Sequence, residues 1–199
     1  MNDKGYYTYT GKLEDWDGSD AIFTNGKVMF HITSTADLVN ITNAVGDKFE
    51  LVTGMLPIQD GVTRNGVVIG GASVWIVRDH PMEELLVARD FVLYMTNAEN
   101  MVSWHKATGY YPVRISSVQL LRDEGWFTEF PNASTAFDQL LDTIPNSATA
   151  GALMGTFQAT RTIVEQAVQK VLAGATVESA LEEAKRLADA ALAEYNANF

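Results

Sequence analysis

The stretch Val67-Val-Ile-Gly-Gly-Ala-Ser-Val-Trp-Ile-Val77 decides how the rest of the chain is interpreted. It is apolar, rich in β-branched residues and interrupted at its centre by Gly70 and Gly71, which predicts a buried strand with a bend or a close approach in its middle. Because glycine has no Cβ, a ligand or another strand can approach its backbone N–H group. Ser73 adds a hydroxyl beside this opening. The same pattern also fits the tight corner of any α/β domain, so the flanking sequence is needed to distinguish a ligand site from an ordinary corner.

Composition limits the classes of protein that the chain can represent. Its 199 residues suffice for one large domain or two small lobes, and 47% hydrophobic with 20% charged residues is typical of a globular protein. The net charge of −11 argues against a nucleic-acid partner, whose phosphates this surface would repel. There is no cysteine, and no run of 18 apolar residues predicts a membrane span. The N-terminus shows no apolar signal core, which by itself predicts a cytoplasmic protein.

The order of predicted elements changes from mixed α/β to helical near residue 80. Strands are predicted over residues 27–33, 49–55 and 67–77 from β-branched and aromatic content. Helices are predicted from apolar spacing and from start and stop residues such as Pro81, Asn97, Gly109, Gly174 and Thr176. The predicted helices cover residues 20–24, 36–44, 81–95, 97–109, 116–124, 133–142, 157–173 and 176–195.

Ser34 and Thr35 stand where a predicted strand gives way to a predicted helix. Side-chain oxygens at that point lie beside the orphan backbone N–H groups of a helix N-terminus, an arrangement that suits an anion or a polar ligand. The alternative is an ordinary N-cap, in which the Ser34 hydroxyl only closes the first turn of the helix.

No catalytic or metal-binding constellation is present in the sequence. The histidines His31, His80 and His105 have no metal-ligand spacing, and there is no Gly-x-Ser-x-Gly elbow, Gly-x-Gly-x-x-Gly motif or P-loop. We expect His31 to be a half-buried structural residue and His105 to be a cation at a helix C-terminus. The sequence therefore predicts neither an enzyme nor a cofactor.

Arg161 is the exception among the charged residues, because it stands in an otherwise neutral and apolar stretch from residue 153 to 164. A planar guanidinium suits bidentate recognition of a phosphate or carboxylate. The alternative is an ion pair with a carboxylate from elsewhere in the fold.

Several segments resemble, in order, the C-terminal half of extracytoplasmic solute-binding proteins (family 1) of ABC importers, and in particular the sn-glycerol-3-phosphate-binding type. The most specific segments are Ile69-Gly-Gly-Ala-Ser-Val-Trp and Trp104-His-Lys-Ala-Thr-Gly-Tyr-Tyr-Pro112. The others are Phe23-Thr-Asn-Gly-Lys-Val-Met, Thr33-Ser-Thr, Asn97-Ala-Glu-Asn and Arg161-Thr-Ile-Val. The resemblance extends from about Gly5 to Tyr195.

The resemblance implies ligand contacts from Ser34, from the backbone of Gly70 or Gly71, from the Tyr110 phenol and from Arg161. In such a family Arg161 and Tyr110 would hold phosphate oxygens, and backbone N–H groups would complete the shell. For Tyr110 the alternative is an aromatic ring that only packs on the preceding helix.

The resemblance also implies an α/β fold of the periplasmic-binding-protein type II-like class with a helix-rich C-terminal half. Residues 1–72 would form the α/β part of the C-terminal lobe, residues 73–111 a returning segment of the N-terminal lobe, and residues 112–199 the helical part of the C-terminal lobe. Because family members run to about twice this length, we expect a missing N-terminal half. An incomplete gene, a deliberately shortened product and a split protein remain open.

The function implied by the resemblance is the substrate-binding component of an ABC uptake system for a phosphorylated polyol such as sn-glycerol 3-phosphate. Its partners would be that small ligand and the permease subunits, and its location would be periplasmic. The alternatives are a relative that binds a sugar, an oligosaccharide or a glycerophosphodiester, and a truncated paralogue that acts only as an interaction module.

Overall fold

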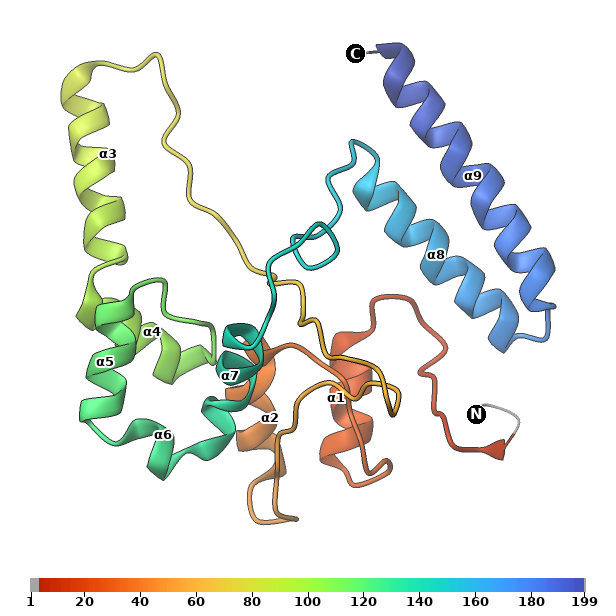
Figure 1. Cartoon of the computed structure of the whole chain (residues 1–199), viewed down its shortest axis with the longest axis horizontal. Coiled ribbons are helices and arrows are strands. Elements are labelled where there is room, and N and C mark those ends of the chain that lie inside the picture. Colours follow the sequence, from red (N-terminus) through yellow and green to blue (C-terminus); the bar gives the residue numbers. More distant parts are fainter. Residues whose placement is uncertain (1–3, 199) are drawn as a thin grey trace. The chain divides into compact units, whose positions relative to one another are not determined.

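The computed structural model describes residues 4–198, and all regular elements in that range are helices (Figure 1). The chain packs as two units: unit 2 is Ile32–Ala150, and unit 1 contains the described parts of Met1–His31 and Gly151–Phe199. The helices are α1 (Trp16–Thr24), α2 (Leu38–Val45), α3 (Met82–Met95), α4 (Ala98–Thr108), α5 (Ile115–Asp123), α6 (Trp126–Glu129), α7 (Thr135–Leu141), α8 (Phe157–Leu172) and α9 (Val177–Asn198), with 3-10 turns η2 (Thr35–Asp37) and η3 (Pro131–Ala133).

In unit 1, α8 and α9 lie side by side and form a helical hairpin (Figure 1). The turn between them uses Gly174 at φ +105, a backbone conformation that favours glycine. Thr176 begins α9 by accepting a hydrogen bond from the Ser179 N–H at 3.2 Å. The most buried hairpin side chains are small, Ala167 and Ala180 at 5% and 3% exposure, which lets the two helices approach closely.

Unit 2 is built around α4 and α5, with α2 packed on α4 and α6 packed on α5. Its most buried side chains come from α2, α4, α5 and α7, namely Ile41, Val45, Val102, His105, Ser117, Val118, Leu121 and Gln139. An aromatic cluster continues this core towards α7, where the ring centroids of Phe127 and Phe137 lie 6.2 Å apart in a stacked arrangement. These contacts position the end of α4, where one candidate site residue stands.

The three predicted strands are absent from the described residues. The strand part of the α/β prediction is therefore wrong within residues 4–198. Residues 27–33, 49–55 and 67–77 have no regular secondary structure. A strand needs a neighbouring strand to pair its backbone groups, and a run of β-branched residues does not by itself supply one.

Side chains of η3 and α7 take over part of the backbone pairing that a neighbouring strand would provide. The Asn132 amide donates to the Leu51 carbonyl at 2.8 Å and accepts from the Thr53 N–H at 2.9 Å. In the same way the Leu56 N–H donates to Gln139 Oε1 at 2.5 Å. The segment from 51 to 56 is therefore held in place without a sheet.

The predicted helices are present at nearly the predicted extents, and the helix-rich C-terminal half is confirmed, but the short helix α6 was not predicted. Asn97 caps α4 by accepting from the Asn100 N–H at 2.7 Å, as its position in the sequence indicates. The prediction is less accurate at α1, which begins four residues earlier than expected. Asp15 caps this helix, and the Ser19 hydroxyl donates to the Trp16 carbonyl within the first turn.

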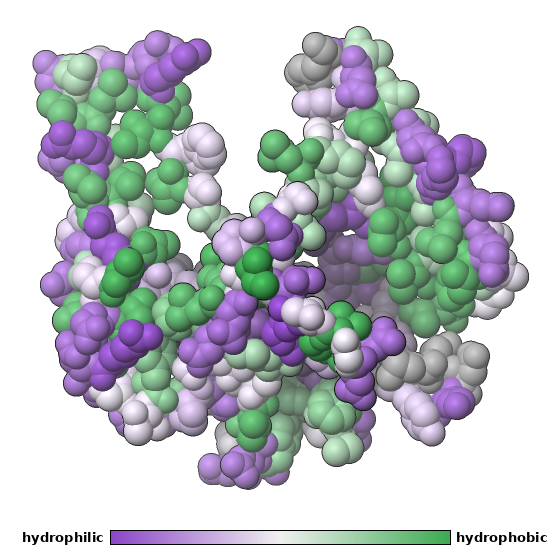
Figure 2. Space-filling view, viewed as in Figure 1, coloured by the Kyte–Doolittle hydropathy of each residue, from purple (hydrophilic) through white to green (hydrophobic). Residues whose placement is uncertain are grey.

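Apolar residues are unusually exposed. The accessible surface of the chain is 14575 Å². The usual scaling of accessible surface with mass gives about 9,300 Å² for one compact protein of this mass and about 11,100 Å² for two separate compact proteins the size of the units. Trp75 is 84% exposed and Val77 69%. Figure 2 shows hydrophobic residues on the visible face, including along α3, whose side chains are all at least partly exposed. Residues 68–77, which the sequence predicts to be part of a buried strand, are all exposed and contribute to this surface.

Candidate functional site

Ser34 caps the turn that leads into α2. Its backbone is extended, at φ −86 and ψ 149, and its hydroxyl oxygen accepts a hydrogen bond from the Ala36 N–H at 3.2 Å. η2 continues directly into α2, so the two form one helical entry. The ordinary N-cap role is thus present, and the exposed Ser34 hydroxyl still has its own O–H to donate.

Tyr110 is brought next to this turn by the end of α4. Helix α4 closes at Gly109, which has φ +92, and its N–H donates to the His105 carbonyl at 2.8 Å. A Cβ on Gly109 would lie 2.3 Å from the Thr35 carbonyl oxygen, so the two backbones touch. Thr35 follows Ser34 and Gly109 precedes Tyr110, and this contact therefore brings the two candidate ligand residues into one neighbourhood.

The Tyr110 side chain lies at the surface, while its backbone is held from beneath. The residue is 40% exposed, and its ring centroid lies 6.5 Å from that of Trp104. The Tyr110 N–H donates to Thr108 Oγ1 at 3.1 Å, and the Tyr110 carbonyl lies 2.8 Å from His105 Nδ1. The predicted packing against α4 is therefore found, and it leaves Tyr110 partly exposed.

His105 is buried, unlike the helix-end cation that its position in the sequence predicts. It is 3% exposed, and its ring packs against Trp126 and Phe127. Burial lowers the pKa of His105; the hydrogen bond to Tyr110 opposes this, and the charge of Lys106 adds to the lowering. The expected cation at the end of the helix is therefore wrong, because a desolvated imidazole near a lysine is neutral. The residues around it, Trp-His-Lys-Ala-Thr-Gly, contain no sequence signal that this histidine is buried.

Gly70 and Gly71 lie in the irregular segment between α2 and α3, where both are exposed. Gly71 has φ +149, and a Cβ added to either glycine would meet nothing within 4 Å. Their N–H groups can therefore be approached, as the sequence predicts. Nearby, Val67 and Ile69 line an open groove of about 230 Å³ with residues from 140 to 150. No contact among the described residues joins the two glycines to Ser34 or Tyr110.

Arg161 belongs to unit 1, on the exposed side of α8. Among residues 4–198 its guanidinium forms no ion pair, whereas other lysines and arginines do. The expectation that it pairs with a carboxylate from elsewhere is therefore wrong within the described residues. Its charge remains available for an anion.

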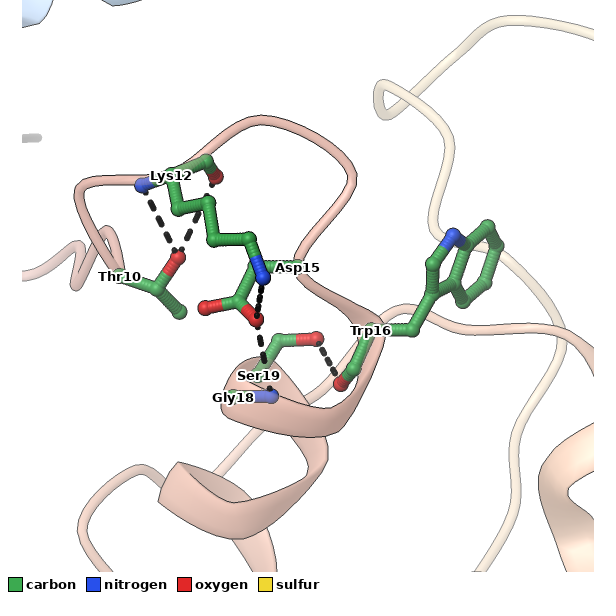
Figure 3. A network of polar contacts seen from close by, with 6 residues as sticks. All are labelled: Thr10, Lys12, Asp15, Trp16, Gly18 and Ser19. Atoms are coloured by element: carbon green, nitrogen blue, oxygen red, sulfur yellow. Dashed lines mark hydrogen bonds and ion pairs between the residues drawn. The ribbon is translucent and has the colours of Figure 1, made fainter.

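A second polar cluster in unit 1 surrounds the start of α1 (Figure 3). Asp15 accepts from the Gly18 N–H at 3.3 Å and pairs with Lys12 at 3.6 Å, and the Thr10 hydroxyl binds the Lys12 backbone. The side-chain hydrogen bond with Thr10 is the main cause of the lowered pKa of Asp15, with Lys12 and the Gly18 N–H adding to it. Each of these contacts serves the capping of α1, so the cluster is structural.

His31 has the structural role expected of it, although it lies outside any strand. Its Nε2 lies 2.7 Å from Asp20 Oδ1, and its ring stacks on Phe23 at 5.5 Å. Within the part of the chain that the structure describes, no three histidine or carboxylate side chains are grouped as metal ligands. The described helices also include none with the length and apolar character of a bilayer span.

Comparisons with known proteins identify the family of this chain. Residues 1–136 match the model of a family described as bacterial extracellular solute-binding protein. The chain is 31% identical over 188 residues to the sn-glycerol-3-phosphate-binding periplasmic protein UgpB of Salmonella typhimurium, 30% over 187 residues to that of Escherichia coli K12, and 29% over 199 residues to that of Yersinia pseudotuberculosis.

These matches cover most of this chain and a smaller part of each relative. The shares are 92%, 92% and 98% of this chain and 42%, 42% and 44% of the relatives. The family fits a periplasmic-binding-protein type II-like fold, whereas the predicted lobe boundaries near residues 72 and 111 stay a prediction. The family model covers well over half of the sequence, and the chain belongs to the bacterial extracellular solute-binding proteins.

Proposed function

We propose that this chain is the substrate-binding component of an ABC uptake system and that it binds a phosphorylated polyol such as sn-glycerol 3-phosphate. The observation that supports the proposal is the Gly109–Thr35 backbone contact, which brings the chain beside Ser34 close to the chain beside Tyr110. The names of the relatives supply the ligand class, since the matched proteins bind sn-glycerol 3-phosphate.

The candidate residues have the chemistry that a phosphate monoester requires. Hydroxyl and phenol groups can donate to phosphate oxygens, and a guanidinium can bind two of them at once. Gly70 and Gly71 add backbone N–H groups that no side chain obstructs. Because the net charge of the chain is −11, an anionic ligand needs a cation among its contacts. Arg161 of unit 1 forms no ion pair within the described residues and stays the predicted cation.

The partners and location follow from the family and are part of the proposal. A solute-binding protein of this kind works outside the cytoplasm, where two lobes close on the ligand and the closed form docks on the permease subunits. The chain spans about four tenths of the length of its relatives, and we infer that further ligand contacts come from a second lobe, the N-terminal half in full-length family members.

The test is a calorimetric titration of the 199-residue chain with sn-glycerol 3-phosphate. Arg161→Ala should weaken binding about 10- to 150-fold, because hydrogen bonds to charged groups contribute about 1.5–3 kcal/mol. Arg161→Lys should recover only part of that loss, because it keeps the charge without the planar fork. Arg186→Ala on α9, an exposed arginine of the same unit, is the matched control and should bind like the parent chain.

Glycerophosphocholine, maltose and free glycerol provide the competing ligands. Tighter binding of glycerophosphocholine or maltose than of sn-glycerol 3-phosphate would replace the proposed ligand by a diester or a sugar. A cooperatively folded chain that responds to none of these ligands would contradict a binding role and favour an interaction module.

A further inference from the structure

His105 makes a contact with the candidate site that the proposed ligand set does not include. It stands in the last turn of α4 and is almost fully buried, at 3% exposure. Its Nδ1 lies 2.8 Å from the Tyr110 carbonyl oxygen, five residues further along the chain. Its own carbonyl accepts from the Gly109 N–H at 2.8 Å. One residue therefore contacts both sides of the turn that presents Tyr110.

The protonation of the imidazole follows from these contacts. A carbonyl oxygen only accepts hydrogen bonds, so Nδ1 must carry the hydrogen that joins His105 to Tyr110. Nε2 is buried and has no hydrogen-bond partner, and a proton on it would remain unsatisfied at a cost. The Nδ1–H tautomer is therefore the one that fits both nitrogens. Histidine supplies this donor at neutral pH without bringing a charge into the core.

The turn at Gly109 and Tyr110 is fixed on its other sides as well. Gly109 adopts a left-handed conformation and touches the Thr35 carbonyl. The Tyr110 N–H is bound to Thr108 Oγ1 at 3.1 Å. Only the orientation of the Tyr110 carbonyl remains to be set, and His105 sets it. The His105 contact therefore restrains the backbone on the C-terminal side of Tyr110, and the Thr108 contact restrains it on the N-terminal side.

We propose that His105 is a positioning residue of the ligand site, whose Nδ1–H holds the Tyr110 carbonyl and so aims the Tyr110 phenol at the bound ligand. This inference rests on the proposed function. It assigns His105 no contact with the ligand itself. The contrasting role is purely structural, in which His105 only fills space between Trp126 and Phe127.

Two amide variants separate these roles. In His105→Asn the amide nitrogen can occupy the place of Nδ1, because both are bonded to Cγ, and it can donate to the Tyr110 carbonyl. In His105→Gln the amide lies one bond further out, near the place of Nε2. His105→Leu retains bulk and offers no donor. Trp126→Phe is the packing control, because it changes the other side of the imidazole ring and leaves the Tyr110 contact intact.

The experiment is a calorimetric titration of the full 199-residue chain and each variant with sn-glycerol 3-phosphate, with a thermal melt of each. We expect the dissociation constant to rise at least tenfold in His105→Leu and His105→Gln. It should stay within threefold of the parent value in His105→Asn and Trp126→Phe. Recovery by asparagine is the result that a packing role does not predict, since asparagine fills less of the cavity than leucine or glutamine.

The two proposals fail in different ways. If the parent chain binds and all three His105 variants bind equally well, or weaken in proportion to their loss of melting temperature, His105 does not position Tyr110. If Trp126→Phe weakens binding as much as His105→Leu, the structural role is correct and the positioning role is wrong. If the folded parent chain binds no sn-glycerol 3-phosphate, the proposed function fails, and the inference about His105 fails with it.

Discussion

Replacing Gly109 by alanine tests the contact that gathers the candidate site. The residue has φ +92, and a Cβ would lie 2.3 Å from the Thr35 carbonyl oxygen and 3.1 Å from Leu38 Cβ. A non-glycine residue in this backbone region costs about 1–2 kcal/mol. Forcing an extra carbon against a backbone atom adds about 1–3 kcal/mol, because a backbone atom cannot move aside as a flexible side chain can. We expect Gly109→Ala to lose about 2–5 kcal/mol of unfolding free energy.

Gly125 provides the matched control for this substitution. It also follows a helix in unit 2, at φ +74, but an added Cβ there would meet nothing within 4 Å. Gly125→Ala should therefore lose only the conformational part, about 1–2 kcal/mol. Urea unfolding followed by far-UV circular dichroism gives both losses as shifts of the midpoint at constant m-value. Equal losses in the two variants would show that Gly109 does not touch Thr35, so that this contact would not bring Ser34 and Tyr110 together.

Three further predictions concern stability. Burial, with a smaller effect of Asp138, raises the pKa of Tyr111 to about 12. The folded-state pKa of Tyr111 thus exceeds the usual value near 10, so its contribution to the unfolding free energy is full below pH 10 and is lost as the pH rises to 12. Thermal melts between pH 10 and pH 12 should therefore show a smaller drop in melting temperature for Tyr111→Phe than for the parent chain. Asn132→Ala should lose about 1–3 kcal/mol of unfolding free energy in urea, because the backbone groups of Leu51 and Thr53 lose the side chain that pairs them. Asn40→Ala, at an exposed position, should lose none. Asn97→Ala should lose about 1 kcal/mol of unfolding free energy, whereas Asn97→Ser should lose little, because serine keeps an acceptor for the Asn100 N–H. Equal losses in the two variants would contradict the capping role.

The sequence predicts the helices well because their signals are local. A cap such as Asn97 and a stop such as Gly109 act within four residues, so the sequence contains the whole interaction. A strand is different, because half of each hydrogen bond belongs to a distant residue. Nothing in residues 49–55 indicates that the Asn132 side chain will take the place of a neighbouring strand.

The candidate site likewise combines residues that local sequence predicts with contacts between distant residues that it does not predict. Ser34 as a cap and Arg161 as an isolated charge can be found from their neighbours in the sequence. The adjacency of Ser34 and Tyr110 depends on the packing of Gly109 on Thr35, a contact across 74 positions. The role of His105 depends on burial, which one histidine among polar residues does not reveal. Packing, rather than residue type, separates what could be predicted from what could not.

The exposed segment from 67 to 77 has a consequence for how proteases act on this protein. Endoproteases bind their substrates as extended chains, and sites without regular structure are cut before helices are. Trp75 is 84% exposed, and the Arg78 side chain that follows is 93% exposed. Brief digestion should therefore cut first after Trp75 with chymotrypsin or after Arg78 with trypsin. Whatever covers this segment in the working protein would slow that first cut, so the cleavage rate becomes a direct assay for the covering partner.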